Sequence, residues 1–414
     1  MQNPTKGSVN QLPMENSITS LLQLQGFILL SLSQNEGGNE LWVDLPRKDT
    51  CPYCGQESTR LHQRARQPSR ILWCFLGLRP VWLVLTRRRL WCHHCQRAFT
   101  QTVPGLARKK RIGVLAVTHI LQSLAEQSFS ATTRSLGVSY GRAKRILLEL
   151  PQPWCDWHHL VGSEEPVNLG IDEHSYRGNN LVTTLTCLSS RNLITILSDD
   201  RQQTLREALR AMPEEVRRRV AAVCIDGKES FRKVVREELP QALVVADHFH
   251  LIQDANRRLD ETRRLEQAEG GWAIPRWPLL KNAEKLTPAQ ERQRDEILQR
   301  YPTLAAQYWV KEHLRALYRC SDWHEANQAL SLILTNCREA EDAETVRWGR
   351  WLERWRTEIL NYFKVRITNG YTEGCHTKIK LLKRLSYGFR NLQVYLRKMM
   401  LGFLPIPQPP HILT

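Results

Sequence analysis

The sequence predicts an α/β protein in which a mixed sheet with a helical insertion follows a zinc-binding module and a helix-turn-helix. Three observations predict this order. Two Cys-x-x-Cys pairs lie early in the chain, two short helical segments flank a glycine soon after them, and β-rich segments alternate with helical ones from about residue 160. Strands that alternate with helices after a run of antiparallel strands form a mixed sheet covered on its faces.

Length and charge bound the number of domains and the kind of partner. The 414 residues exceed one ordinary domain and predict two or three. Lys and Arg (59) outnumber Asp and Glu (42), which gives a net charge of +17 and predicts an acidic partner, either nucleic acid or an anionic membrane surface. The apolar runs are too short to span a bilayer or are interrupted by Arg79 and Pro80, and the first residues show no signal-peptide pattern. We therefore expect DNA, no membrane, and a cytosolic location.

Residues 1–46 form an N-terminal segment with one apolar patch, and residues 47–104 are the predicted zinc module. Its candidate ligands are Cys51, Cys54, Cys92 and Cys95. Each Cys-x-x-Cys pair places two thiolates at the separation that tetrahedral Zn²⁺ requires, and two pairs complete a closed structural site. The alternative is a chance pairing of cysteines. The other seven cysteines are interpreted as small buried hydrophobic residues.

Residues 105–158 are the predicted helix-turn-helix domain. The segment "SATTRSLGVSYGRAKRIL" contains two short helices separated by Gly137, with Ser139 as the cap of the second. A basic second helix is typical of a DNA reader, although an ordinary helical hairpin is the alternative. The residues expected to contact DNA here and beside the zinc module are Arg142, Lys144, Arg145, Arg87, Arg88 and Arg89.

The α/β region begins with three β-rich segments, "VNLGIDEHSY", "LVTTLTCLSS" and "NLITILSDD", which predict an antiparallel meander. The segments "AAVCID" and "QALVVAD" predict a fourth and a fifth strand, each preceded by a helical segment. Strand signals then vanish, and residues from about 256 to 365 are a predicted helical insertion.

Acidic residues close three of these strands. Asp172, Asp226 and Asp247 end the first, fourth and fifth strands, and Glu373 begins a basic helix. One such acid is usually a turn former, a helix cap or a favourable charge at a helix N-terminus. Together they predict a site where carboxylates bind a pair of Mg²⁺ ions for phosphoryl transfer. The cations expected to bind phosphates beside it are Lys378, Lys380, Lys383 and Arg384.

The motifs "GIDEHS", "CID", "VVADHFHL" and "NGYTEGCHTKIKLLKRLSYGFRN", together with the two N-terminal modules, resemble the ISL-three family of bacterial insertion-sequence transposases. The resemblance covers nearly the whole chain. It implies an RNase H-like catalytic domain at residues 160–405, a DDE triad, Mg²⁺, and cleavage and joining of DNA at transposon ends. It also implies a double-stranded DNA partner, a homodimer or higher oligomer on DNA, and a bacterial cytoplasmic, nucleoid-associated protein.

In this resemblance Asp172 is the first acid of the triad and Glu373 is the last. Asp226 is preferred as the middle acid because the fourth strand of an RNase H-like sheet lies beside the first. Asp247 is the alternative, since "DHFH" resembles an acid-x-x-His signature of related transposases. The chain departs from the family pattern at "EGCHTKIK". Two other functions stay open: a zinc and helix-turn-helix DNA-binding regulator, and a metal-dependent DNA nuclease without strand joining.

Overall fold

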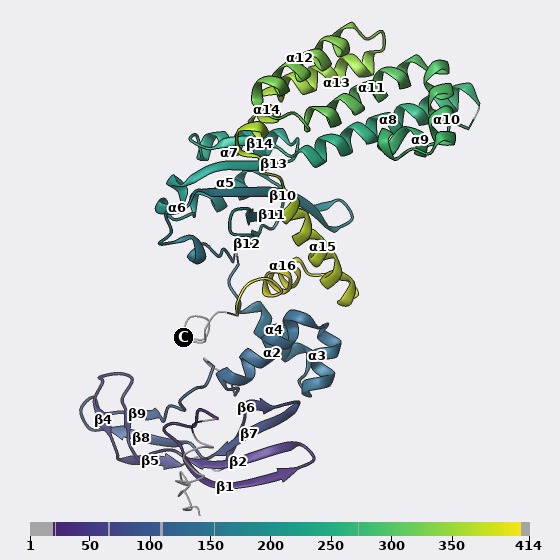
Figure 1. The fold of residues 1–414 in the computed structure, drawn as a ribbon. Helices are drawn as coiled ribbons and strands as arrows, with labels where there is room; N and C mark the ends of the chain where they lie inside the picture. Colours follow the sequence, from purple (N-terminus) through teal and green to yellow (C-terminus); the bar gives the residue numbers. More distant parts are fainter. Residues whose placement is uncertain are drawn as a thin grey trace, which may run out of the picture. The chain divides into compact units, whose positions relative to one another are not determined.

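The structure is a computed structural model that describes residues 20, 22–64, 67–107, 111–152, 154–271 and 273–406. The chain divides into two compact units, Met1–Gln152 with Leu382–Thr414, and Pro153–Leu381 (Figure 1). Residues 1–19 of the predicted N-terminal segment lie outside the described residues. Among the described residues, no helix has both the length and the apolar character needed to cross a membrane.

The first unit contains a four-stranded sheet in the order β1-β2-β7-β6. Its strands are β1 (Ile28–Asn35), β2 (Gly38–Asp44), β6 (Ser69–Leu76) and β7 (Arg79–Leu85). The strands β1 and β2 lie within the predicted N-terminal segment, and β2 pairs parallel with β7. Leu22, Leu24 and Leu41 are buried in one core with Ile71 and Leu83, so this segment forms part of the sheet's core.

Two small sheets carry the cysteine pairs. One has the order β5-β8-β9 and the other pairs β3 with β4. Their strands are β3 (Asp49–Thr50), β4 (Glu57–Ser58), β5 (Leu61–Arg64), β8 (Arg88–Cys92) and β9 (Arg97–Thr100).

The described helices of the first unit include α2 (Val114–Glu126), α3 (Phe129–Leu136), α4 (Tyr140–Leu148) and α16 (Leu392–Leu401). Gly137 ends α3 in the left-handed conformation, and the Ser139 hydroxyl accepts a hydrogen bond from the Arg142 amide. The predicted turn and cap are therefore present. Helix α16 packs against α2 and α4, and Arg397 Nε donates to the Leu150 carbonyl at 2.7 Å.

The second unit contains a mixed five-stranded sheet in the order β12-β11-β10-β13-β14. The first three strands are antiparallel, whereas β13 and β14 run parallel to β10. This confirms the predicted mixed sheet. Its strands are β10 (Val167–Arg177), β11 (Asn180–Cys187), β12 (Asn192–Ile196), β13 (Val220–Ile225) and β14 (Leu243–Ala246). The helices between them are α5 (Gln202–Arg210), α6 (Glu214–Arg218) and α7 (Glu229–Glu238).

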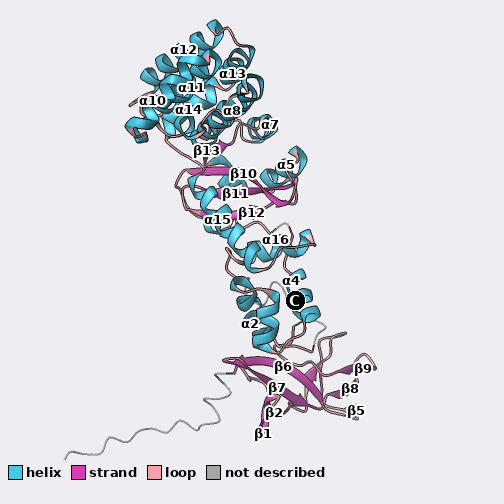
Figure 2. Ribbon diagram, turned by 90° about the vertical axis from the view of Figure 1, so that its right-hand side faces the viewer, coloured by secondary structure: helices cyan, strands magenta, loops and turns pink. Residues whose placement is uncertain are grey.

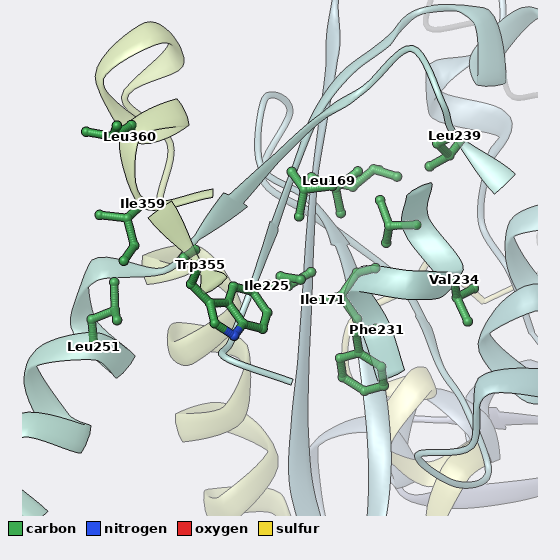
Figure 3. Close-up of a cluster of buried hydrophobic side chains, with 14 of the residues drawn as sticks. Leu169, Ile171, Ile225, Phe231, Val234, Leu239, Leu251, Trp355, Ile359 and Leu360 are labelled. Atoms are coloured by element: carbon green, nitrogen blue, oxygen red, sulfur yellow. The ribbon is translucent and has the colours of Figure 1, made fainter. Parts of the chain in front are cut away.

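The core of this unit lies where the sheet packs against α7 and against helices of the helical region. Ile171 and Ile225 on adjacent strands belong to one buried cluster with Phe231 of α7 (Figure 3). Trp355 and Ile359 of the helical region join the same cluster (Figure 3). The helical region therefore shares a core with the sheet.

From His248 to Val365 the described residues contain helices and no strand (Figure 2). The α-helices are α8 (His248–Gly270), α9 (Trp277–Leu280), α10 (Pro288–Arg300), α11 (Pro302–Leu317), α12 (Trp323–Glu339), α13 (Ala343–Arg354) and α14 (Arg356–Val365). Helix α15 (Gly370–Leu385) follows, and its first turns lie against β10.

Gly170 of β10 permits this close approach. A Cβ atom at this position would lie 2.6 Å from Thr372 Oγ1 and 2.7 Å from both Asn369 Oδ1 and Thr186 Oγ1. Because real Cβ atoms do not approach other atoms so closely, any side chain here would displace the start of α15.

We expect Gly170→Ala to lower the free energy of unfolding by about 1–3 kcal/mol, because the added methyl group overpacks the contact between β10 and α15. Urea unfolding followed by circular dichroism measures the change. Gly374→Ala is the matched control, since a Cβ atom there meets no atom within 4 Å. The control should be as stable as the parent protein or more so, and equal destabilisation by both variants would contradict the steric explanation.

Candidate active site

Three aspartates come together across β10, β13 and β14. Asp226 and Asp247 directly follow β13 and β14, as predicted, whereas Asp172 lies within β10, which continues to Arg177, so the prediction that Asp172 ends the first strand is wrong. Ile171 is in register with Ile225, and Ile225 is in register with Ala246. Asp172, Asp226 and Asp247 each follow one of these residues. The three strands are parallel to one another, so the three acids form a row along one edge of the sheet, as the sequence predicted.

Helix α15 brings Glu373 to the same edge. The Asn369 amide donates to Asp247 Oδ1 at 3.0 Å, and Asn369 Nδ2 donates to the Ile171 carbonyl at 3.2 Å. Thr372 Oγ1 lies 2.7 Å from Thr186 Oγ1 on β11. These hydrogen bonds fix the first turn of α15, and Glu373 lies on that turn.

His250, in the first turn of α8, lies among the acids. Its Nδ1 is 2.9 Å from Asp247 Oδ2, whereas its Nε2 is 3.4 Å from Glu373 Oε1 and 3.9 Å from Asp172 Oδ2. One ligand atom from each of Asp172, His250 and Glu373 can be chosen so that all three lie within 4.8 Å of one another. This group has the spacing needed to hold a metal ion.

Asp247 differs from the other acids in that both of its carboxylate oxygens accept hydrogen bonds. Its Oδ1 accepts the Asn369 amide and its Oδ2 accepts from His250. Burial acts to raise the pKa of Asp247, but these hydrogen bonds outweigh it and the pKa falls below its usual range. Asp247 is also the N-cap of α8. It therefore orients His250 and ties α15 to the sheet.

Asp226 has the opposite character. Its Oδ1 is buried and has no hydrogen-bond partner in the described part of the chain. Burial, together with the charge of Glu173, raises the pKa of Asp226 to about 6. Asp226 also lines a cavity of about 560 Å³ together with Gly227, His250, Arg257 and Trp351. A buried carboxylate oxygen without a donor is suited to a cation.

The pKa values of the remaining groups reflect this crowding of charge. Burial raises the pKa of Asp172 to about 7, and the charges of Asp226 and Glu373 add to the effect. Burial acts to lower the pKa of His250, but the hydrogen bond with Asp247 and the charges of Asp172 and Asp226 raise it to about 9. The cluster therefore retains protons that isolated groups would release.

His376 is a neighbour of the first acid that the sequence did not predict. His376 Nδ1 lies 3.5 Å from Asp172 Oδ2, and its Nε2 lies 3.0 Å from Thr184 Oγ1. Burial lowers the pKa of His376 to about 4, so the ring is neutral at pH 7. Asn369 and Gly170 were missed as well. Their roles depend on contacts between distant segments, and only the departure from the family pattern at "EGCHTKIK" pointed to His376.

The four predicted zinc ligands also come together. The Sγ atoms of these four residues, Cys51, Cys54, Cys92 and Cys95, all lie within 4.8 Å of one another. The Cys51–Cys95 and Cys54–Cys92 sulfur distances are 3.6 and 3.5 Å. Zn–S bonds of about 2.3 Å in a tetrahedron place sulfur atoms about 3.8 Å apart. The four thiols therefore fit a tetrahedral metal ion.

The predicted DNA-binding cations lie in three places. Lys378, Lys380, Lys383 and Arg384 are on α15, and Arg142, Lys144 and Arg145 are on α4. Beside the cysteine cluster, Arg89 is exposed and Arg87 is half-buried. Arg88 instead forms an ion pair of 2.5 Å with Asp44 and donates to the Leu45 carbonyl, so its guanidinium group stabilises the module itself.

Comparison with known proteins identifies relatives of this chain. The family model of DDE transposases of the ISL-three type, described as "Transposase", matches residues 169–399. The transposase for insertion sequence element IS1001 of Bordetella parapertussis is 25% identical over 370 residues, covering 85% of this chain and 88% of that protein. The transposase for IS1557 of Mycobacterium tuberculosis (strain H37Rv) is 27% identical over 263 residues, covering 56% of this chain and 59% of that protein.

Among solved structures, the Drosophila P element transposase strand transfer complex aligns with a TM-score of 0.37 and 11% identity. The alignment covers 72% of this chain and 93% of that chain.

The raised pKa values predict how a divalent cation affects stability. Asp172 and Asp226 bind protons more tightly in the folded than in the unfolded state, so the metal-free protein loses stability as pH rises from about 4 to 7. At pH 8 both are charged, and a bound cation relieves their repulsion. We expect 10 mM Mg²⁺ to raise the Tm by roughly 5 °C at pH 8, and by much less at pH 5, where these acids are mostly protonated.

Differential scanning fluorimetry measures this shift. Asp172→Asn should abolish the Mg²⁺ effect, whereas Asp295→Asn, which removes an exposed carboxylate on α10, should retain it. An equal shift at both pH values, or in both variants, would show that Mg²⁺ acts elsewhere on the protein.

Proposed function

The chain belongs to the ISL-three family of DDE transposases, and from this premise we propose that Asp172, Asp226 and Glu373 are its three catalytic acids. Its activity is that of a DNA transposase, and its partner is DNA. In our proposal it binds the ends of an insertion sequence, cleaves a phosphodiester bond and joins the freed end to target DNA. The observation that carries the assignment is the row of acids at one sheet edge beside Glu373.

The choice of Asp226 as the middle acid rests on its hydrogen bonding. Its unpartnered buried oxygen lines the cavity beside His250, whereas Asp247 already accepts from Asn369 and His250. Asp247 thus acts as a positioning residue that holds His250 near Asp172 and Glu373.

We further assign an RNase H-like topology to the catalytic domain, predicted at residues 160–405. The order β12-β11-β10-β13-β14, with the fourth strand beside the first, supports this assignment. Helices α8 to α14 are then an insertion between the fifth strand and the helix that carries the last acid.

In this proposal the three carboxylates hold Mg²⁺. When bound, a pair of such ions polarises the scissile phosphate and the attacking oxygen. Asp172 is held near the neutral His376 ring, and Glu373 is fixed by the hydrogen bonds at the start of α15. The cations that follow Glu373 on α15 bind the DNA phosphates. Water attacks the phosphorus and the 3′ oxygen leaves. The freed 3′ hydroxyl then attacks a target phosphorus, again in line, and the 3′ oxygen of the target strand leaves.

The first unit is the proposed recognition unit. Cys51, Cys54, Cys92 and Cys95 of this unit hold structural Zn²⁺, and the α3–α4 pair acts as a helix-turn-helix with Arg142, Lys144 and Arg145 facing DNA. The spacing of the thiols and the Gly137 turn support these assignments. We place the protein in the bacterial cytoplasm with the nucleoid, and expect a homodimer or higher oligomer on the DNA.

We expect the Ala variants of Asp172, Asp226 and Glu373 each to abolish cleavage of labelled element ends in Mg²⁺, because each removes a metal-binding carboxylate. DNA binding should survive, since it depends on the basic surfaces. Gel analysis of nicked and joined products provides the measurement. Nicked products without joined ones would identify a nuclease instead of a transposase.

Asp247→Asn is the informative comparison for the middle acid. It should reduce cleavage only partly, because the Asn carbonyl oxygen can still accept the Asn369 amide, whereas its NH2 group cannot accept from His250. Full loss with Asp247→Asn together with normal cleavage by Asp226→Ala would transfer the role to Asp247. Normal cleavage by Glu373→Ala would leave that residue only its favourable charge at a helix N-terminus.

For the cysteine cluster, we expect about one zinc ion per chain in the purified protein, measured by plasma mass spectrometry. Cys51→Ser should remove that zinc and unfold the local β-structure, because a structural metal contributes folding free energy directly. Cys74→Ser, which changes a buried cysteine outside the cluster, should keep it. Zinc-free native protein would refute the assignment.

A further inference from the structure

The loop that joins α15 to α16 contains a highly exposed aromatic residue with an unusual backbone conformation. Tyr387 is 93% exposed, and its backbone has a φ of 55°, in the left-handed region that non-glycine residues seldom adopt. Gly388 follows with a φ of 84°. An exposed ring on a strained backbone contributes little to the stability of the fold. Its presence therefore suggests a contact with a binding partner.

The neighbouring residues hold the loop in place. The Tyr387 and Gly388 amides donate to the carbonyls of Arg384 and Lys383, which ends α15. The Phe389 ring packs edge-on against Tyr395, whose side chain is fully buried. The loop is therefore anchored at both ends, and the Tyr387 ring is presented to solvent from a fixed position.

A cavity of about 370 Å³ lies between this loop and the start of the α3–α4 pair. Among the described residues that line it, none is acidic, while Lys144 and Arg390 are cations. The Ser386 hydroxyl oxygen at its wall is buried and has no hydrogen-bond partner in the described part of the chain. Tyr140, which also lines the cavity, is 55% exposed.

We propose that this cavity binds a backbone phosphate of the element-end duplex, with the Tyr387 ring against the adjoining nucleotide. Two cations and a free hydroxyl in a wall without acids complement a phosphate group, and an exposed ring offers a face to a sugar or base. Lys144 belongs to the second helix of the proposed helix-turn-helix. The inference thus rests on the proposed function and extends its DNA surface to residues 386–391.

The test uses full-length protein and fluorescence anisotropy with a labelled element-end duplex at several salt concentrations. Arg390→Gln should lower affinity and reduce the salt slope by about 1, the value expected for one lost phosphate contact. Arg292→Gln removes an exposed arginine on α10 of the other unit and should leave affinity and slope unchanged.

Tyr387→Gly separates binding from folding. Glycine adopts a positive φ without strain, so the Tm should hold or rise, whereas affinity should fall about tenfold through loss of the ring. Tyr387→Phe keeps the ring and should bind as the parent protein does. Unchanged affinity in both Tyr387→Gly and Arg390→Gln, with an unchanged salt slope, would overturn the loop contact.

The proposed recognition function can fail separately. If the parent protein binds element ends no better than random duplex, end recognition by the first unit is wrong. The salt slope of Arg390→Gln on random duplex still decides the loop contact, because phosphate contacts carry no sequence information.

Discussion

The candidate active site depends on how the start of α15 attaches to the sheet. Asn369 supplies two hydrogen bonds, one to the carboxylate of Asp247 and one to the carbonyl of Ile171, across more than a hundred residues of intervening chain. Gly170 leaves the space in which this contact forms. The same attachment brings Glu373 close to Asp172 and His250. The geometry of the acids therefore follows from hydrogen bonds donated by the main-chain and side-chain amides of Asn369.

Electrostatics explains why so rigid an attachment is useful. The chain has a net charge of +17, yet this edge of the sheet gathers four acids around one histidine. Buried carboxylates that repel one another tend to move apart or to keep their protons. Fixed strands and a pinned helix hold them together until a cation arrives.

The sequence allowed the mixed sheet and the row of aspartates to be predicted because both depend on local patterns. An apolar run ending in an acid marks the ends of β13 and β14, although β10 continues past its acid to Arg177. Gly137 followed by Ser139 marks the turn between α3 and α4. Contacts between distant segments had no such signal. Neither the parallel pairing of β2 with β7 nor the Arg88–Asp44 ion pair leaves a periodic trace in the sequence. The role of Asn369 was hidden for the same reason.

The first unit is built from both ends of the chain, since α16 packs against α2 and α4. The Lys398 ammonium group is buried in that packing and donates to the Leu124 carbonyl. During synthesis, α2 and α4 leave the ribosome long before α16 exists, so their apolar faces stay uncovered while the whole second unit is translated. Folding of the first unit is thus completed last, although most of it is made first. A truncated mRNA that ends before the codons of α16 would yield chains that expose these apolar faces. Such chains would become substrates for chaperones and proteases.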